Sequence, residues 1–372
     1  MNIINLYEKY FDSDTKKVFE LLSKSDYKLY LVGGLVRDIL LNRKSLDIDI
    51  TVEGNAIEFA KTIPCKILSV HKDFGTVKVE INGKNIDFAS TRTESYPKAG
   101  HLPYVEKIST PLKDDILRRD FTVNALAMSL NNDTFCEVVD YVDGIKDLEN
   151  KTLKVLHDKS FIDDPSRILR GLKYSSRLGF TLEENTKNLQ DEYLSNINYD
   201  MSYSRILNEF NRIEWSPKTF ETLIEQGIYK LINPDITKEF DFWFTPTETI
   251  VYLGLLEPDE NFELTKQERH IISDVKKCYN TTSKTDFEIY KTFSSIAVEV
   301  AQICSISGNK QAKHYLQNLK DIKIETTGQD LINMGLKPSK DFKKILDFIT
   351  EEKLKKPYLT KTDELELVRT FF

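Results

Sequence analysis

The sequence predicts an α+β protein, with strands and helices mixed in the N-terminal part and helices in the rest of the chain. Two strand patterns, Phe74–Ile81 and Asn85–Ser90, flank Asn82-Gly83, a dipeptide typical of tight β-hairpin turns. Beyond Thr181 no alternating pattern persists, and the chain reads as helices separated by short polar or proline-bearing breaks. A chain of 372 residues exceeds the length over which one core usually grows, so we expect two or more domains.

The composition is that of a soluble globular protein, with 40% hydrophobic and 30% charged residues. No apolar run approaches the roughly 18 residues that span a membrane, and the first residues do not resemble a signal peptide. The four cysteines are scattered without a CxxC pair, which argues against a zinc site or a disulfide framework and favours a reducing cytoplasm. A net charge of −7 argues against a strongly basic nucleic-acid binder, although a local basic surface can still contact phosphates.

The segment Leu29–Val52 begins with a glycine turn. A short apolar strand, Tyr30–Val32, runs into Gly33-Gly34, and a helical run that carries Arg37 follows. Glycines at the start of a helix let backbone N–H groups approach an anion. An isolated Gly-Gly is more often a plain turn, so this pair of glycines alone does not decide between a plain turn and an anion-binding turn.

The same segment ends in an acidic pair. Leu46–Ile50 alternates apolar and acidic residues, which predicts a half-buried strand with Asp47 and Asp49 on one face. Two carboxylates held this close repel each other unless a cation lies between them, and such oxygen ligands suit Mg²⁺. A lone Asp-x-Asp is common on solvated strand edges, but beside a phosphate-binding turn it indicates phosphoryl or nucleotidyl transfer. Asp87, on the second hairpin strand, is either a third metal ligand facing this pair or a surface residue.

Two further segments of the N-terminal part carry charge. Thr91–Leu112 has little periodicity, and a loop of this length in a compact domain is usually functional or mobile. Its basic residues either approach a nucleotide or RNA end or lie on a plain surface loop. Arg118, Arg119 and Asp120 precede an apolar run containing Asn124, where they could orient a triphosphate or a ribose. The spacing of these three residues by itself favours the alternative, a solvent-exposed helix start with a salt bridge.

A second informative segment predicts a helix with Pro165 in its first turn. Asp164, Arg167 and Arg170 recur every third residue and Lys173 extends the series, so these charges fall along one side of the helix. A carboxylate can accept from the exocyclic amine of cytosine or adenine while a neighbouring guanidinium donates to a ring nitrogen or carbonyl. The alternative is a plain salt-bridged helix.

A lysine-rich turn lies near the end of the chain, before the predicted helix Asp341–Ile349. Such a turn can bind RNA phosphates, although by itself this segment favours a solvated lysine-rich face. The candidate RNA-binding residues are Lys337, Lys340, Lys343 and Lys344.

Four short motifs follow one another in the first half of the chain. They are Leu31–Asp38 (LVGGLVRD), Asp47–Asp49 (DID), Arg118–Ala125 (RRDFTVNA) and Asp163–Arg170 (DDPSRILR). In order and spacing they resemble the motifs of class II (bacterial-type) tRNA nucleotidyltransferases and their poly(A) polymerase relatives. The resemblance implies a nucleotidyltransferase head (palm) domain at 1–150 and three helical domains: a base-recognising neck at 151–225, a body at 226–310 and a tRNA-binding tail at 311–372.

The resemblance also implies an activity, the template-independent addition of CCA to the tRNA 3′ end from CTP and ATP with release of pyrophosphate. Asp47 and Asp49 would bind Mg²⁺ and, with Asp87, form the catalytic acids. Asp163 stands where the family usually has Glu, and Lys173 where it usually has Arg; both keep the charge, so we expect function to be retained. The residues that would hold the nucleotide are Gly33, Gly34, Arg37, Arg119, Asn124, Asp164, Arg167, Arg170 and Lys173.

Several alternatives remain at this stage. Some members of the family add only CC or only A, and the loop Thr91–Leu112, whose loss resembles a CC-only enzyme, favours an enzyme that can finish with A. A poly(A) polymerase of the same architecture is the nearest enzyme alternative. A catalytically silent RNA-binding protein is a different class, against which the intact carboxylates argue, and a DxD glycosyltransferase would explain neither the glycines nor the Asp164/Arg167 pair. The oligomeric state stays open.

Overall fold

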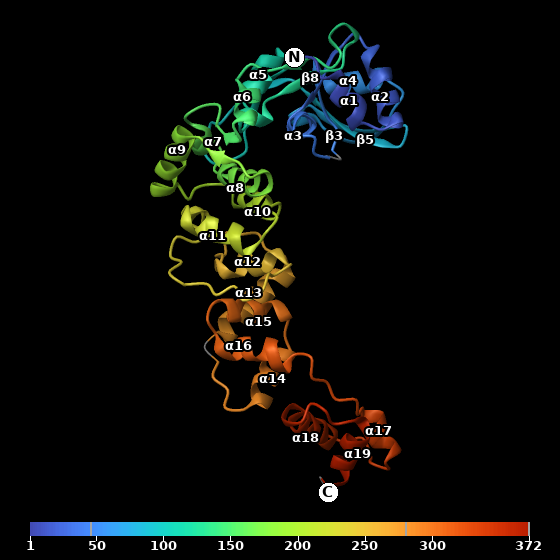
Figure 1. Ribbon diagram of the computed structural model, residues 1–372, viewed down its shortest axis with the longest axis vertical. Coiled ribbons are helices and arrows are strands. Elements are labelled where there is room, and N and C mark those ends of the chain that lie inside the picture. Colours follow the sequence, from blue (N-terminus) through green and yellow to red (C-terminus); the bar gives the residue numbers. More distant parts are fainter. Residues whose placement is uncertain (45–46, 280, 371–372) are drawn as a thin grey trace. The chain divides into compact units, whose positions relative to one another are not determined.

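The computed structural model describes residues 1–44, 47–279 and 281–370, and it confirms the α+β class (Figure 1). The chain divides into two compact units, the first comprising Met1–Glu214 with Thr222–Leu231 and the second Trp215–Glu221 with the chain from Ile232 onward. All strands of the described residues belong to the first unit. None of the described helices is long and apolar enough to cross a membrane. The division into head, neck, body and tail is finer than these two units and stays a prediction.

A seven-stranded mixed sheet forms the centre of the first unit, in the order β3-β4-β5-β2-β1-β8-β9. Strand β1 pairs antiparallel with β2 and β8, and β2 pairs parallel with β5. This order places Asp49 and Asp87 opposite each other on the neighbouring strands β2 and β5. The strands are β1 Lys28–Val32, β2 Asp49–Glu53, β3 Lys66–His71, β4 Thr76–Ile81, β5 Lys84–Ser90, β8 Ala127–Ser129 and β9 Val138–Val139.

Apolar residues at every second position give this sheet a buried face. On β4, Val77, Val79 and Ile81 are buried while the residues between them are partly exposed. The buried face shares one hydrophobic core with the helices α1 (Ile4–Tyr10), α2 (Ser13–Ser23) and α4 (Ala56–Thr62). The other face is therefore left for polar side chains, including those of the acidic motif.

The predicted hairpin forms, but the acidic strand begins later than expected. Asn82 and Gly83 both have positive φ (50° and 76°), as the tight turn between β4 and β5 requires. Strand β2 begins at Asp49, so Asp47 precedes it, and residue 46 lies outside the described residues. The pairing with β1 reaches only from Lys28↔Glu53 to Leu31↔Ile50, because β1 ends and turns at Gly33, so a longer β2 would lack this partner.

Several strands were missing from the sequence expectation. The predicted loop Thr91–Leu112 contains the hairpin of β6 (Arg92–Ser95) and β7 (Tyr104–Ile108), which pair only with each other. Because neither strand has a fully buried face, neither carries the apolar alternation that marks a strand. The edge strand β3 has a register shift within its pairing with β4, which breaks its alternation in the same way.

The helix predicted at Pro165 is confirmed as α8, Ser166–Leu178, which follows Pro165 directly and ends at Gly179 in the left-handed conformation. Short 3₁₀ turns of the first unit span Lys72–Phe74, Thr122–Asn124, Asn132–Thr134 and Ile228–Leu231, and β10 (Thr152–Leu153) pairs with β11 (Thr181–Leu182). The remaining helices before residue 215 are α3 Gly34–Leu40, α5 Leu112–Leu117, α6 Gly144–Glu149, α7 Ser160–Asp163, α9 Glu184–Ser195 and α10 Tyr203–Phe210.

The rest of the chain is helical, as expected. Helix α11 (Pro217–Glu225) contributes residues to both units. The last three helices enclose a small core of their own around Leu331, Ile345, Ile349 and Val368. The helices of the second unit are α12 Thr249–Leu255, α13 Lys266–Cys278, α14 Asp286–Ser294, α15 Val298–Ile306, α16 Lys310–His314 with a π-helical turn at Tyr315–Leu319, α17 Gly328–Asn333, α18 Asp341–Lys355 and α19 Lys361–Thr370.

Candidate active site

A polar cavity of about 720 Å³ lies in the first unit, lined by the sheet, the β6–β7 hairpin, α8 and α10. All four predicted motifs contribute to its wall, although together they span more than a hundred residues of the sequence. This convergence makes the cavity the candidate active site. Lining residues that were predicted to be functional include Gly33, Gly34, Asp49, Arg119, Asp164 and Arg167.

The glycine turn brings bare backbone to the cavity wall. Gly33 has φ +69° and ψ −138°, a conformation that residues with a side chain rarely adopt. A Cβ on Gly33 would lie 3.4 Å from Nη1 of Arg119, so the missing side chain lets the backbone approach this guanidinium. Helix α3 has only seven residues. We therefore ascribe the attraction for a phosphate at this wall to Arg119 rather than to a helix dipole.

Arg119 has donors that no group of the described residues uses. Its Nη2 lies 2.9 Å from Asp115 Oδ2 and 3.4 Å from Thr51 Oγ1. Its Nε is enclosed and has no hydrogen-bond partner within the described part of the chain. Burial alone would raise the pKa of Asp115, but the charges of Arg119 and Arg118 hold it below its usual value. Nη1, which also makes no hydrogen bond to the described residues, lies beside Gly33 at the cavity wall, where a phosphate oxygen from a ligand could accept from it.

The predicted acids are only partly brought together. Asp47 and Asp49 line the cavity, and burial together with the charges of Asp87 and Asp47 raises the pKa of Asp49. Asp87 does not line it, and its Oδ2 lies 3.0 Å from Nζ of Lys78. Within residues 1–44, 47–279 and 281–370, no three acidic, histidine or cysteine groups form a ready-made metal cluster. Asp87 lies opposite Asp49 on the neighbouring strand but is bound by a lysine, so the convergence of three acids on a metal stays a prediction.

The pair of Asp47 and Asp49 fits a magnesium ion. Mg²⁺ is usually held by one or two carboxylates together with substrate phosphates and waters rather than by an all-protein cage. Desolvation and then the neighbouring charges of Asp87 and Asp47 raise the pKa of Asp49, and a bound cation would favour its ionised form. Asp47 and Asp49 are the residues that would hold the ion.

Arg37 lies beneath the cavity rather than on its wall. The side chain is 2% exposed, and its Nε and Nη2 donate to Asp38 Oδ1 at 2.9 and 2.8 Å. Its Nη1 donates to Asn124 Oδ1, and the guanidinium stacks over Tyr174. These three bonds use three of the five N–H donors of the guanidinium, and Arg37 does not line the cavity, so its contact with triphosphate, implied by the family resemblance, stays a prediction. Asn124 does line the cavity.

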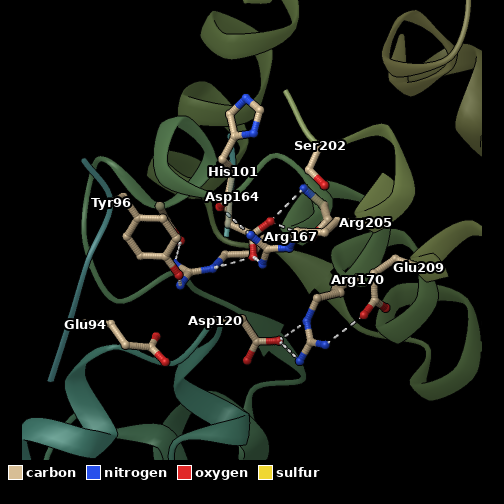
Figure 2. Close-up of polar contacts among 12 residues, drawn as sticks. Glu94, Tyr96, His101, Asp120, Asp164, Arg167, Arg170, Ser202, Arg205 and Glu209 are labelled. Atoms are coloured by element: carbon tan, nitrogen blue, oxygen red, sulfur yellow. Dashed lines mark hydrogen bonds and ion pairs between the residues drawn. The ribbon is translucent and has the colours of Figure 1, made fainter. Parts of the chain in front are cut away.

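Asp120, Arg170 and Glu209 form a chain of charges along the cavity wall (Figure 2). Arg170 donates to Asp120 Oδ2 through Nε at 2.7 Å and to Glu209 Oε1 through Nη1 at 3.1 Å. Burial alone would raise the pKa of Asp120, but the Arg170 charge and the hydrogen bond from the Phe121 N–H lower it to about 2. Lys173, predicted to hold nucleotide, instead donates to Glu209 Oε2 at 2.8 Å. Arg170 and Lys173 are thus tied to protein carboxylates.

The predicted base-reading pair consists of Arg167 on α8 and Asp164, which precedes the helix, and both side chains already bind protein groups (Figure 2). Asp164 accepts hydrogen bonds from the N–H of Ser166 at 3.1 Å and from Arg205 Nη2. Arg167 donates to Ser160 Oγ at 2.6 Å and to the backbone oxygen of Arg118 at 3.0 Å. Both side chains are more than nine-tenths buried, so a base could be read here only by exchanging part of these contacts.

Helix α10 and the turn that follows it supply wall residues that the sequence patterns did not indicate. Arg205, Asn208, Glu209 and Arg212 all line the cavity. Arg205, Glu209 and Arg212 are spaced i, i+4, i+7, which places them on one side of a helix and is the signal that could have found them. This spacing is equally typical of the solvent-exposed side of a helix, and only the packing of α10 against α8 distinguishes the two cases.

The predicted RNA-binding lysines lie in the second unit. Lys337, Lys340 and Lys343 are exposed and have no ion-pair partner in the described part of the chain. Lys344 is exposed as well, and its Nζ lies 2.8 Å from Asp341 Oδ1. Three free positive charges are therefore available for a phosphate backbone, and the fourth is partly neutralised.

Comparison with known proteins connects this cavity to one family. Residues 29–154 match the poly A polymerase head domain, the stretch that carries three of the four motifs. An A-adding tRNA nucleotidyltransferase of Halalkalibacterium halodurans is 29% identical over all of this chain and 96% of its own length. A similar enzyme of Geobacter sulfurreducens is also 29% identical over 98% of this chain, which spans only 48% of that relative.

A solved structure agrees over the whole chain. The Thermotoga maritima CCA-adding enzyme complexed with tRNA has a TM-score of 0.76 and 26% identity, and the match covers 100% of this chain and 99% of that one. Sequence motifs, head-domain match and fold therefore agree. In its motifs, its head-domain match and its fold, the chain is similar to the class II tRNA nucleotidyltransferases and poly(A) polymerases, and these similarities support a nucleotidyltransferase.

Proposed function

We propose that this protein adds the CCA end to tRNA from CTP and ATP without a nucleic-acid template, with Mg²⁺ as its cofactor. One observation carries the proposal. A single cavity joins two acidic residues, an arginine with unpaired donors, and a carboxylate–guanidinium pair, which are the groups that a metal, a triphosphate and a base respectively require. The tRNA named for the Thermotoga maritima structure supports the choice of acceptor.

The reaction is the attack of the tRNA 3′-hydroxyl on the α-phosphate of the nucleotide, which expels pyrophosphate. A bound Mg²⁺ would lower the pKa of the hydroxyl and stabilise charge on the leaving group. Asp47 and Asp49 would hold that ion, while Arg119 and the bare backbone at Gly33 would receive the phosphates. Asp164 and Arg167 orient the base. Because the protein forms no covalent bond to the substrate, alignment and charge stabilisation provide the acceleration.

A narrower activity, addition of the terminal A alone, is the second candidate. It is favoured by the two A-adding relatives, which align with nearly all of this chain. The choice between the two depends on whether the base-reading pair accepts cytosine as well as adenine. Cytosine and adenine each present an amine beside an acceptor, so the residue types alone allow both.

The test is incorporation into two tRNA substrates, one lacking the whole CCA end and one ending in CC, with CTP, ATP or both. A CCA-adding enzyme extends the first substrate by three residues when both nucleotides are present. An A-adding enzyme leaves the first substrate unextended and adds one A to the second. A long A tail would indicate a poly(A) polymerase, and no incorporation into either substrate would contradict the proposal.

A further inference from the structure

Tyr174 is a buried residue of the cavity wall that none of the roles above uses. It lies on α8, seven residues after Arg167, or about 10 Å further along the helix. Its ring centroid lies 5.2 Å from Cζ of Arg37, and a Cβ on Gly34 would lie 3.2 Å from Nη2 of that same guanidinium. Tyr174 is therefore at the glycine-turn end of the cavity, away from the base-reading pair.

Three cations surround the ring of Tyr174. Arg37 and Lys173 each lie 5.2 Å from its centroid and Arg170 lies 5.8 Å from it, while Phe121 packs edge-on at 5.9 Å. Each cation is also bound to a carboxylate of the protein. The ring is thus held in one place by groups that are themselves fixed.

The hydroxyl of Tyr174, in contrast, has no partner. The hydroxyl makes no hydrogen bond to any of the described residues. It is also not fully enclosed, unlike the other unpaired buried polar atoms, so it still reaches the open space of the cavity. The residue as a whole is only 8% exposed. Buried tyrosine hydroxyls usually find a partner, so a fixed and unpaired one that faces a polar cavity indicates a ligand.

The protonation state of this hydroxyl suits a donor. Burial, and then the charge of Asp120, raises the pKa of Tyr174 to about 12. At neutral pH the hydroxyl therefore keeps its proton and can donate it to a negatively charged oxygen. A hydrogen bond to a charged acceptor is stronger than one between neutral groups.

We propose that the Tyr174 hydroxyl donates a hydrogen bond to a phosphate oxygen of the incoming nucleoside triphosphate. This inference rests on the proposed function, because it takes the nucleotide to be the ligand of the cavity. The phosphate is favoured over the base because Tyr174 lies beside the glycine turn and two helical turns from Arg167. Tyr174 is then a nucleotide-contacting residue that tightens binding of any nucleoside triphosphate, whatever its base.

The test is Tyr174→Phe, which removes the hydroxyl and keeps the ring among its three cations. Calorimetric titration of the full chain with ATP, CTP, dATP and pyrophosphate, each with Mg²⁺, measures Kd without any tRNA. We expect all four to bind about tenfold more weakly to the variant than to the wild type, which is the usual cost of one hydrogen bond to a charged group. The melting temperature stays unchanged, since the packing is kept.

Tyr7→Phe is the matched control, because Tyr7 is also buried, at 3% exposed, but lies on α1 outside the cavity. It should bind all four ligands as the wild type does. Equal affinities for wild type and Tyr174→Phe would overturn the inference. A loss with ATP but not with dATP or pyrophosphate would assign the hydroxyl to the ribose and overturn the phosphate contact. Failure of the wild type itself to bind ATP would instead count against the proposed function.

Discussion

At the residue scale, the cavity is built from charges that neutralise one another beneath its surface. Asp120 is the clearest case, since it is 6% exposed and is bound by Arg170, by Asn124 and by the Phe121 N–H. The lowered pKa of this carboxyl means that the folded state favours its ionised form. Asp120 therefore contributes to stability as well as to the shape of the site.

Asp120→Asn should lower the free energy of unfolding at pH 7, and the difference from wild type should shrink in acid. A folded-state pKa of about 2 against an ordinary value of 3.8 corresponds to about 2 kcal/mol. Because the pKa is depressed, this stabilisation is complete above about pH 4 and is lost as the pH falls toward 2. Urea unfolding of both proteins at pH 7 and pH 3 measures it. A difference that stays the same at both pH values would contradict the assignment.

The sequence motifs predicted most of the residues that line the cavity, but not the contacts that those residues make. Asp49, Arg119, Asp164 and Arg167 all reach the cavity wall, as their motifs predicted. Arg37 belongs to the first motif, but it lies beneath the cavity and donates to Asp38 and Asn124. A motif gives residue types at a spacing, whereas the partners of a guanidinium depend on packing between distant segments, which no local pattern encodes.

At the element scale, close backbone packing positions the third motif. Gly144 begins α6 and lies against the 3₁₀ turn Thr122–Asn124, where a Cβ would be 2.3 Å from the backbone oxygen of Thr122. The side-chain hydroxyl of Thr122 also donates to Asp147 Oδ2 at 2.7 Å. This contact fixes the turn that carries Asn124 to the cavity.

Gly144→Ala should therefore destabilise the first unit by about 2 kcal/mol and lower the melting temperature by several degrees, because backbone must move to admit the methyl group. Thermal unfolding followed by circular dichroism measures the change. Gly328→Ala is the control, since its Cβ would meet only Phe342 at an ordinary 3.8 Å, and it should melt as the wild type does or slightly higher. Equal melting of both variants would contradict the packing argument.

Local patterns predicted some elements and missed others for a physical reason. The turn at Asn82-Gly83 and helix α8 were found because turn chemistry and a proline start are encoded locally. Strands β6 and β7 were not found, because they pair outside the main sheet and bury no apolar face. A strand held by backbone pairing alone leaves little trace in the order of its side chains.

At the scale of the whole molecule, the class and the helical second half followed from the sequence, but the contribution of α10 to the site did not. It depends on α10 packing against α8, from which α9 separates it in the sequence. The two compact units suggest a division of labour, with chemistry in the first and tRNA contacts in the second. The exposed lysines of the second unit allow that division to be tested.

Replacing Lys337, Lys340 and Lys343 together by alanine should weaken tRNA binding and leave ATP binding unchanged. For every phosphate that these lysines neutralise, the slope of log Kd against log salt should fall by about 0.7 to 0.9 in the variant. Filter binding over a range of salt concentrations measures both the affinity and the slope. Lys344→Ala serves as the comparison and should have a smaller effect, because Asp341 already neutralises this side chain. Unchanged tRNA affinity and slope in the triple variant would exclude this face as the tRNA-binding surface.

The acidic pair at the cavity underlies the whole functional assignment, and the double variant Asp47→Asn with Asp49→Asn tests it most directly. Labelled ATP incorporation into a tRNA ending in CC should fall by more than about a hundredfold, since such electrostatic groups each contribute several kcal/mol to transition-state stabilisation. Melting temperature and tRNA affinity should stay close to those of the wild type. A loss of less than about tenfold would contradict metal-assisted nucleotidyl transfer at this cavity.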